Sequence, residues 1–190
     1  EIVDIAGLVK GASKGEGLGN KFLANIKETN AIMHVLRCFD DDNITHVDGS
    51  INPIRDKEII DFELMVKDLE TIDKKIGSLS RLSNTGDKTA IQQIDILGKY
   101  KEKLSEGFPA RSFDIDHDEF IDELQLLTNK PVLYVCNVDQ NSMGGNEYTK
   151  TVSENIKNED AKMIIIATGI ESEINELESE EDRCEFLNDI

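Results

Sequence analysis

The sequence lacks the features that place a protein in a membrane or build a disulfide framework. No apolar run approaches the roughly 18 residues that a membrane-spanning helix needs. Only three cysteines occur, Cys38, Cys136 and Cys184, and they show neither CxxC spacing nor paired histidines nearby. We therefore expect reduced thiols, no structural zinc, no membrane partner and a cytoplasmic location.

Positive charge is also scarce. The 190 residues contain 21 Lys+Arg against 39 Asp+Glu, a formal net charge of −18. Nucleic-acid binders gain affinity by neutralising phosphates with Lys and Arg, so we expect no strong autonomous nucleic-acid binding, although the net charge still allows a local basic face. The acidic residues crowd the last twenty positions, where the pattern favours a solvated face or a frayed end.

Short apolar runs alternate with helical patterns along the chain. The runs at 31–36, 131–136 and 163–167 are β-rich and nearly continuous, as in strands that are buried on both faces. Residues 21–29 and 147–158 have helical patterns. This alternation predicts an α/β fold with a parallel sheet.

About ninety residues separate the first two strands, far more than a crossover helix requires. Apolar residues at three- and four-residue steps predict a long helix over 56–82, a turn at 83–87 and a second helix over 88–105, followed by a short helix over about 118–127. We interpret this interval as an inserted helical hairpin, packed as an antiparallel coiled coil. The predicted segments are 1–52, 53–128 and 129–190, with the insertion in the middle.

The first motif with chemical meaning is Asp4-Ile5-Ala6-Gly7, directly after an apolar strand end. In P-loop NTPases a DxxG at a strand tip contacts Mg²⁺ through the Asp and the γ-phosphate through the Gly N–H, because a residue without Cβ allows close approach. The tetrapeptide alone is weak evidence, since it occurs by chance in many chains.

The surrounding sequence is much more specific. Residues 4–29 read DIAGLVKGASKGEGLGNKFLANIKET, and the later strings HVLRCFDDDNITHVDGSINPIRDKEIID, FPARS and KPVLYVCN continue the pattern. This chain resembles the YchF family, also called Obg-like ATPases, over nearly its whole length. The resemblance implies a P-loop NTPase G domain with a coiled-coil insertion, followed by a TGS domain. It also implies Mg²⁺-dependent hydrolysis of ATP or GTP and association with ribosomes or translation factors.

Two of these parts, the phosphate-binding loop and the TGS domain, are not in the sequence. No GxxxxGK[ST] occurs, and such a loop supplies most of the phosphate affinity through backbone N–H groups and a Lys. The chain starts at Glu1 within an apparent strand, which we interpret as a trimmed chain, a proteolytic fragment or an interrupted gene. We therefore expect no hydrolysis by these residues alone; the enzyme would be the complete protein.

The resemblance assigns roles near the phosphates. Asp4 would hold Mg²⁺ through water, and Gly7 would donate its N–H to the γ-phosphate. Leu8 stands where many GTPases have the Gln that orients the attacking water. His46, in a polar loop, is our candidate for that task, with an idle surface histidine as the alternative.

The resemblance also places the base-reading motif after the strand at 131–136. There Asn137, Val138 and Gln140 replace the NKxD of GTPases, so the Asp that selects guanine is missing. Losing that partner is worth roughly tenfold to hundredfold in discrimination, so we expect adenine to be accepted at least as well as guanine. Asp139 is one position early and should point elsewhere. Ala167-Thr168-Gly169 stands where the family usually has Ser-Ala-Lys, and Thr168 completes the predicted nucleotide site.

A second hypothesis treats the chain as a non-catalytic interaction module. It keeps the fold but has lost nucleotide binding, and the departures at Gln140 and Thr168 favour it. A third, a purely structural coiled coil, explains only residues 56–105.

Overall fold

The computed structural model describes residues 1–5, 18–44, 49–113 and 119–189. The chain forms two compact units. Unit 1 comprises Glu1–Ile32, Lys57–Val132 and Asn158–Asp160, and unit 2 comprises Met33–Asp56, Leu133–Lys157 and Ala161–Ile190. Within the described ranges, no helix combines the length and the apolar character needed to cross a membrane.

The elements follow the alternation that the sequence predicts. The strands are β1 (Ile32–Arg37), β2 (Val132–Asn137) and β3 (Ala161–Ile166). The α-helices among the described residues are α1 (Leu18–Glu28), α2 (Pro53–Ser83), α3 (Lys88–Ser105), α4 (Glu119–Leu124), α5 (Glu147–Asn155), α6 (Thr168–Glu176) and α7 (Glu180–Asp189). Short 3₁₀ turns are η2 (Ala110–Ser112), η3 (Leu127–Asn129), η4 (Gln140–Ser142) and η5 (Ile156–Asn158).

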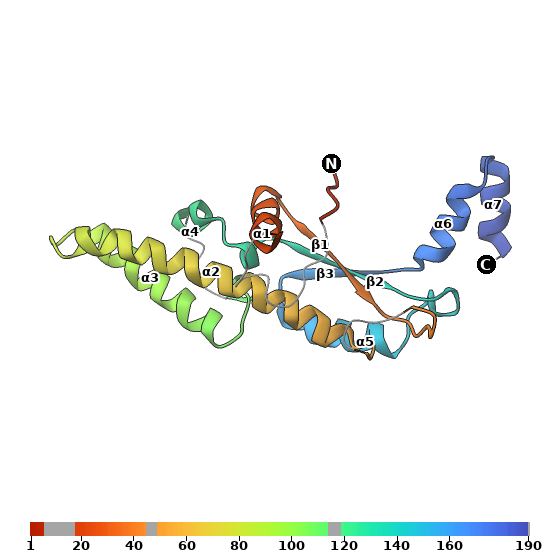
Figure 1. Cartoon of the computed structure of the whole chain (residues 1–190), viewed down its shortest axis with the longest axis horizontal. Helices are drawn as coiled ribbons and strands as arrows, with labels where there is room; N and C mark the ends of the chain where they lie inside the picture. The colour runs from red at the N-terminus through yellow and green to blue at the C-terminus, as the bar shows by residue number, and fades with distance from the viewer. Residues whose placement is uncertain (6–17, 45–48, 114–118, 190) are drawn as a thin grey trace. The chain divides into compact units, whose positions relative to one another are not determined.

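The three strands form one parallel sheet in the order β1-β2-β3 (Figure 1). The N–H of Ile32 donates to the carbonyl of Pro131 at 2.9 Å, and the N–H of Cys38 donates to that of Asn137 at 2.8 Å. The offset between donor and acceptor is the same at both ends, as a parallel ladder requires. β2 lies between its neighbours and is mostly buried, which explains its nearly continuous apolar sequence. The predicted α/β class and parallel sheet are confirmed.

Helices α2 and α3 form a hairpin in unit 1, which we call the arm (Figure 1). Its apolar cluster repeats every seven residues on both helices, the spacing that coiled-coil packing uses. The buried residues with this spacing are Met65, Ile72 and Leu79 on α2, and Ala90, Leu97 and Leu104 on α3. At the turn, Gly86 has φ +86° and the Asp87 carboxylate accepts the N–H of Ala90 at 2.9 Å, which caps α3.

The start of α2 differs from the sequence-based expectation, and the acidic tail is more regular than its charge suggested. α2 begins at Pro53, not Asp56, because Pro is tolerated in the first turn and the Asn52 Oδ1 caps it by accepting the N–H of Arg55 at 3.0 Å. The acidic tail forms α6 and α7 with its acidic side chains exposed, so of the two expected alternatives the solvated face is the one found. Glu180, Glu181 and Asp182 occupy the first turn of α7, where negative charge favours a helix.

The part of α2 nearer its start carries buried polar groups that fasten it to other parts of unit 1. Asp68 accepts the N–H groups of Leu127 and Thr128, at 2.7 and 2.8 Å, and the Thr128 hydroxyl at 2.7 Å. Burial raises the pKa of Asp68 to about 6, against the opposing effect of these hydrogen bonds. This carboxylate therefore holds η3 against the arm.

Two turns before Asp68, Asp61 belongs to a buried network of four charged side chains. The Arg111 guanidinium donates to Asp61 at 2.7 Å and to Glu159 at 2.9 and 3.0 Å, and the Lys57 ammonium donates to the same two carboxylates at 2.8 and 2.6 Å. The four side chains are at most 10% exposed. Burial alone would raise the pKa of Asp61, but Arg111 and Lys57 outweigh it and hold that pKa below its usual range.

Candidate functional site

The ends of β2 and β3 meet at Asn137 and Thr168, both in unit 2. The Asn137 Oδ1 accepts the Thr168 hydroxyl at 2.9 Å and the Thr168 N–H at 3.1 Å. These donors assign the amide orientation, since only the oxygen accepts. The Asn137 Nδ2 has no hydrogen bond to any described residue. The structure thus brings together two predicted site residues that are 31 positions apart.

The next three residues differ sharply in exposure. Val138 is 3% exposed, and its N–H donates to the carbonyl of Ile166 at 2.9 Å, so it joins β2 to β3. The Asp139 carboxylate turns back onto η4, where it accepts the N–H of Asn141 at 2.8 Å and the Ser142 hydroxyl at 3.0 Å. Gln140 is exposed. Asp139 therefore points elsewhere, as expected, while Gln140 is the side chain that the loop presents to solvent.

Sequence reasoning missed the groups that shape the end of β1. Arg37 donates to the carbonyls of Phe39 at 3.1 Å, Asp41 at 3.1 Å and Ile44 at 2.8 Å, which folds the loop after the strand. The Asn146 Nδ2 donates to the carbonyl of Cys38 at 2.7 Å and ties α5 to β1. Asn146 also forms a capping box with Thr149. The available sequence signal was Asn146 three residues before a Thr, ahead of a helical pattern.

Cys38 and Cys136 lie side by side, and both are 0% exposed. Contact with the Cys136 thiol and then burial raise the pKa of the Cys38 thiol, so Cys38 holds its proton near neutral pH. Cys184 on α7 is exposed, and all three thiols are free. Cys38 and Cys136 therefore act as small apolar core residues beside the Asn137 loop.

The predicted phosphate-side residues are only partly described. Asp4 is in unit 1 and exposed, whereas Gly7, Leu8 and His46 lie outside the described residues. The described ranges contain no cluster of three His, Cys, Asp or Glu side chains arranged to hold a metal. A lone carboxylate such as Asp4 fits Mg²⁺ bound largely through water, the usual mode for this ion beside phosphates.

The sheet, with Asn137 and Thr168 at the carboxyl ends of its strands, defines a P-loop GTPase-type domain. A family described as "50S ribosome-binding GTPase" matches residues 1–67. The chain is also similar to the protein titled "Structure of the Schizosaccharomyces pombe YchF GTPase", with 34% identity and a TM-score of 0.76, covering 95% of this chain and 50% of that one.

Curated relatives refine the class. The chain is 47% identical to the "Ribosome-binding ATPase YchF" of Bacillus subtilis and 43% identical to that of Escherichia coli O157:H7, and each alignment covers 100% of this chain and 53% of the relative. The chain belongs to the YchF family. It spans about half the length of the curated relatives it matches.

Proposed function

We propose that the complete protein containing this chain binds and hydrolyses a nucleoside triphosphate, with ATP accepted at least as well as GTP. The observation that carries the proposal is the Asn137–Thr168 bridge at the carboxyl ends of adjacent parallel strands, where α/β proteins of this type bind ligands. In this proposal the amide N–H groups of Asn137 donate to a base nitrogen. The printed names of the relatives, ATPase and GTPase, agree with this class of substrate.

The base preference rests on Gln140. Its exposed amide carries both a donor and an acceptor, as the adenine N6/N1 edge requires, whereas an Asp would accept two hydrogen bonds from guanine. The Asp139 carboxylate cannot substitute, because η4 uses it. The buried Val138 would hold the loop to β3 through its backbone N–H, and Thr168 would orient Asn137 by donating to its side-chain oxygen.

On the phosphate side, Asp4 would hold Mg²⁺ through water and Gly7 would contact the γ-phosphate. The ion would neutralise the charge that develops on the phosphates. His46 is our candidate for positioning the attacking water. The phosphate loop must come from residues other than these 190, since no GxxxxGK[ST] occurs among them.

We further propose that the complete protein works in the cytoplasm with the ribosome or translation factors. The curated relatives are named ribosome-binding, and the free thiols suit a reducing compartment. The arm is the element we assign to partner docking, since it extends two amphipathic helices of 31 and 18 residues.

The proposal is tested by titrating fluorescent ATP and GTP, with Mg²⁺, into the 190-residue chain and into the complete protein. We expect binding and hydrolysis by the complete protein only. Micromolar binding by the chain alone would contradict the need for a phosphate loop. The variant Val138→Lys/Gln140→Asp should shift preference toward GTP by about tenfold, and an unchanged ratio would overturn the base assignment.

A non-catalytic interaction module is the second candidate. The Gln140 and Thr168-Gly169 departures from the usual motifs favour it. A complete protein that binds neither nucleotide, yet unfolds cooperatively, would establish this reading in place of the first.

A further inference from the structure

Asp139 lies between two predicted site residues, Val138 and Gln140, but the proposed function gives it no task. Its carboxylate uses both oxygens within the loop: Oδ1 accepts the N–H of Asn141 at 2.8 Å, and Oδ2 accepts the hydroxyl of Ser142 at 3.0 Å. The N–H of Ser142 also donates to the carbonyl of Asp139 at 3.0 Å. Asp139 thus caps the three-residue turn η4, whose first residue is Gln140.

The Gln140 side chain has no support of its own. It is exposed and forms no hydrogen bond with any described residue. A glutamine side chain has several rotatable bonds, so holding it in one direction for a ligand costs conformational entropy. Because Asp139 bonds to groups on both of the residues that follow Gln140, it fixes the backbone at position 140. It thereby fixes the direction in which the Gln140 side chain leaves the loop.

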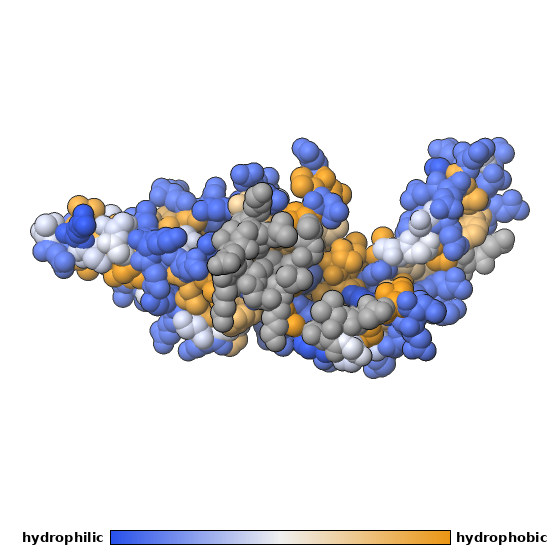
Figure 2. Space-filling model, in the orientation of Figure 1, coloured by the Kyte–Doolittle hydropathy of each residue, from blue (hydrophilic) through white to orange (hydrophobic). Residues whose placement is uncertain are grey.

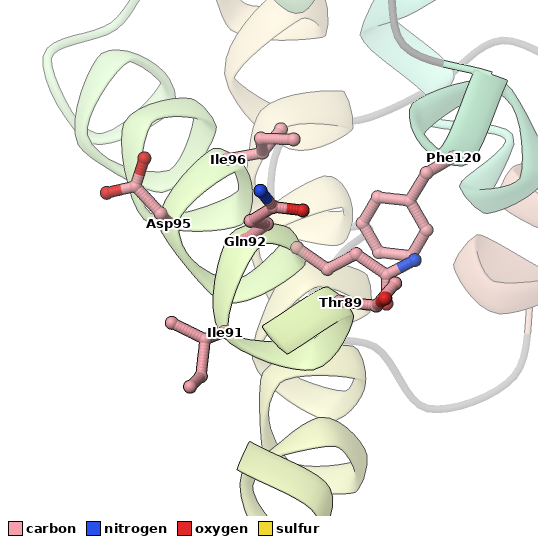
Figure 3. Close-up of a pocket in the computed structure, with 7 residues that line it drawn as sticks. Thr89, Ile91, Gln92, Asp95, Ile96 and Phe120 are labelled. Carbon is pink, nitrogen blue, oxygen red and sulfur yellow. The ribbon is translucent and has the colours of Figure 1, made fainter. Parts of the chain in front are cut away.

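The two described grooves of the chain do not supply walls for Gln140. The first, of about 680 Å³, lies between α3 and α4, where Phe120 faces the residues of α3 (Figure 3). The second, of about 780 Å³, is lined by residues within 24–30 and 122–131. Neither is lined by Asn137, Gln140 or Thr168. Hydrophilic residues predominate on the visible face of α6 and α7, the helices that begin at Thr168 (Figure 2). The loop itself must therefore orient Gln140.

Other groups hold the two ends of this loop, so Asp139 acts on the part between them. At the start, the N–H of Val138 donates to the carbonyl of Ile166 at 2.9 Å. At the end, Gly145 has φ +103°, and an added Cβ there would lie 2.9 Å from the Thr149 hydroxyl oxygen of α5, so only glycine fits. Between these points, the side-chain hydrogen bonds among the described residues come from the Asp139 carboxylate.

We propose that Asp139 is a positioning residue for base recognition: it holds the turn from which Gln140 presents its amide to adenine, and so helps to set the preference between ATP and GTP. This inference rests on the proposed function, since it requires that Gln140 contacts the base. Asp139 itself does not touch the nucleotide. Asn caps a turn about as well as Asp, whereas Ala cannot accept the N–H of Asn141. The two substitutions at position 139 should therefore differ.

The test compares kcat and KM for ATP and for GTP in variants of the complete protein. Asp139→Ala should lower the ratio of kcat/KM for ATP to that for GTP by about fivefold, the effect of losing one capping interaction. The change should lie in KM, because a base contact stabilises the bound substrate and the transition state equally. Asp139→Asn should keep most of the ratio. The matched control, Glu147→Ala, removes the same charge from an exposed position in the first turn of α5 and should leave the ratio unchanged.

A double variant shows whether Asp139 acts through Gln140. Gln140→Ala should lower the ratio by itself, and Asp139→Ala/Gln140→Ala should lower it no further, because the turn then has no amide to position. Independent losses that multiply in the double variant would overturn the inference. So would an unchanged ratio in Asp139→Ala where Gln140→Ala lowers it, or equal losses of kcat for both nucleotides, which would reduce Asp139 to a role in stability. An unchanged ratio in Gln140→Ala would overturn the base assignment of the proposed function as well, so the two failures are distinguishable.

Discussion

The network of Lys57, Asp61, Arg111 and Glu159 should be the most sensitive point of unit 1. Arg111→Met removes a guanidinium that is 2% exposed and that contacts two carboxylates. Within the network, Asp61 and Glu159 would then share the Lys57 ammonium, which leaves these side chains with one excess negative charge. Breaking a buried pair on one side costs about 3–5 kcal/mol. That is a large part of the roughly 5–15 kcal/mol that stabilises a whole domain.

The assay is urea unfolding followed by far-UV circular dichroism, in which α2 and α3 dominate the signal because of their length. Arg111→Met/Glu159→Met removes one charge of each sign and keeps the Lys57–Asp61 pair at 2.8 Å. We expect the loss of unfolding free energy in this double variant to be at least about 2 kcal/mol smaller than the sum of the losses in the two single variants. Lys150→Met is the control, since the Lys150–Glu147 pair is 70% and 87% exposed and should contribute less than about 1 kcal/mol.

The sign of the pH dependence gives a second check on the same network. The pKa of Asp61 is lowered in the folded protein, so its contribution is complete above the unfolded pKa, about 4, and is lost as the pH falls below it. In Arg111→Met the stranded carboxylates are relieved by protonation, so the difference from wild type should shrink in acid. A cost below about 1 kcal/mol, strict additivity in the double variant, or a difference that grows in acid would each refute this account.

Three further predictions concern other parts of the chain. The pKa of Asp68 is raised to about 6 in the folded protein, so the free energy of unfolding of the wild type should fall by about 3 kcal/mol as the pH rises from about 4 to about 6. Urea midpoints measured over this pH range should show this fall in the wild type and lack it in Asp68→Asn. Leu97→Ala should lower the free energy of unfolding in urea by about 2–5 kcal/mol, because Leu97 is fully buried. Gly98→Ala, at the next residue, should raise it by about 0.5–1 kcal/mol, because an added Cβ there meets no other atom. Equal effects of the two variants would contradict the assigned face of α3. Ellman's reagent should titrate Cys184 alone in the native protein and all three thiols in urea, so that more than one fast thiol in the native state would exclude the buried pair.

The elements that could be predicted from the sequence are those whose pattern is local. All three strands were found from their apolar runs, but only the central strand β2 is mostly buried, as a strand covered on both faces is. β1 and β3 leave Met33, Val35 and Ile164 exposed, so the expected burial on both faces is wrong for them. The arm is visible because its buried residues repeat every seven positions, as at Ile72 and Leu79 or at Leu97 and Leu104. The α2 start was missed because a Pro at the first helical position looks like a breaker when its Asn52 cap is not considered.

The contacts that position the candidate site were not predictable, because their partners are far apart in the chain. Asn146 and Cys38 are 108 positions apart, and Arg111 and Glu159 are 48 positions apart. Asn137 and Thr168 were both identified as site residues, but their mutual hydrogen bonds required the register of β2 against β3. The roles of Asp4, Gly7 and His46 stay predictions that come from the family resemblance.

The placement of charge along the arm follows what each ion pair does for stability. Near the start of α2, Lys57 and Asp61 are buried and paired at 2.8 Å, so removing one partner is costly. Farther along the arm, Lys99 contacts Asp95 at 2.8 Å and Lys101 contacts Asp73 at 2.5 Å, and these four side chains are 46–68% exposed. Such exposed pairs contribute less than about 1 kcal/mol each, because water screens them. The stability of the arm therefore depends on charge mainly where its helix meets the buried network.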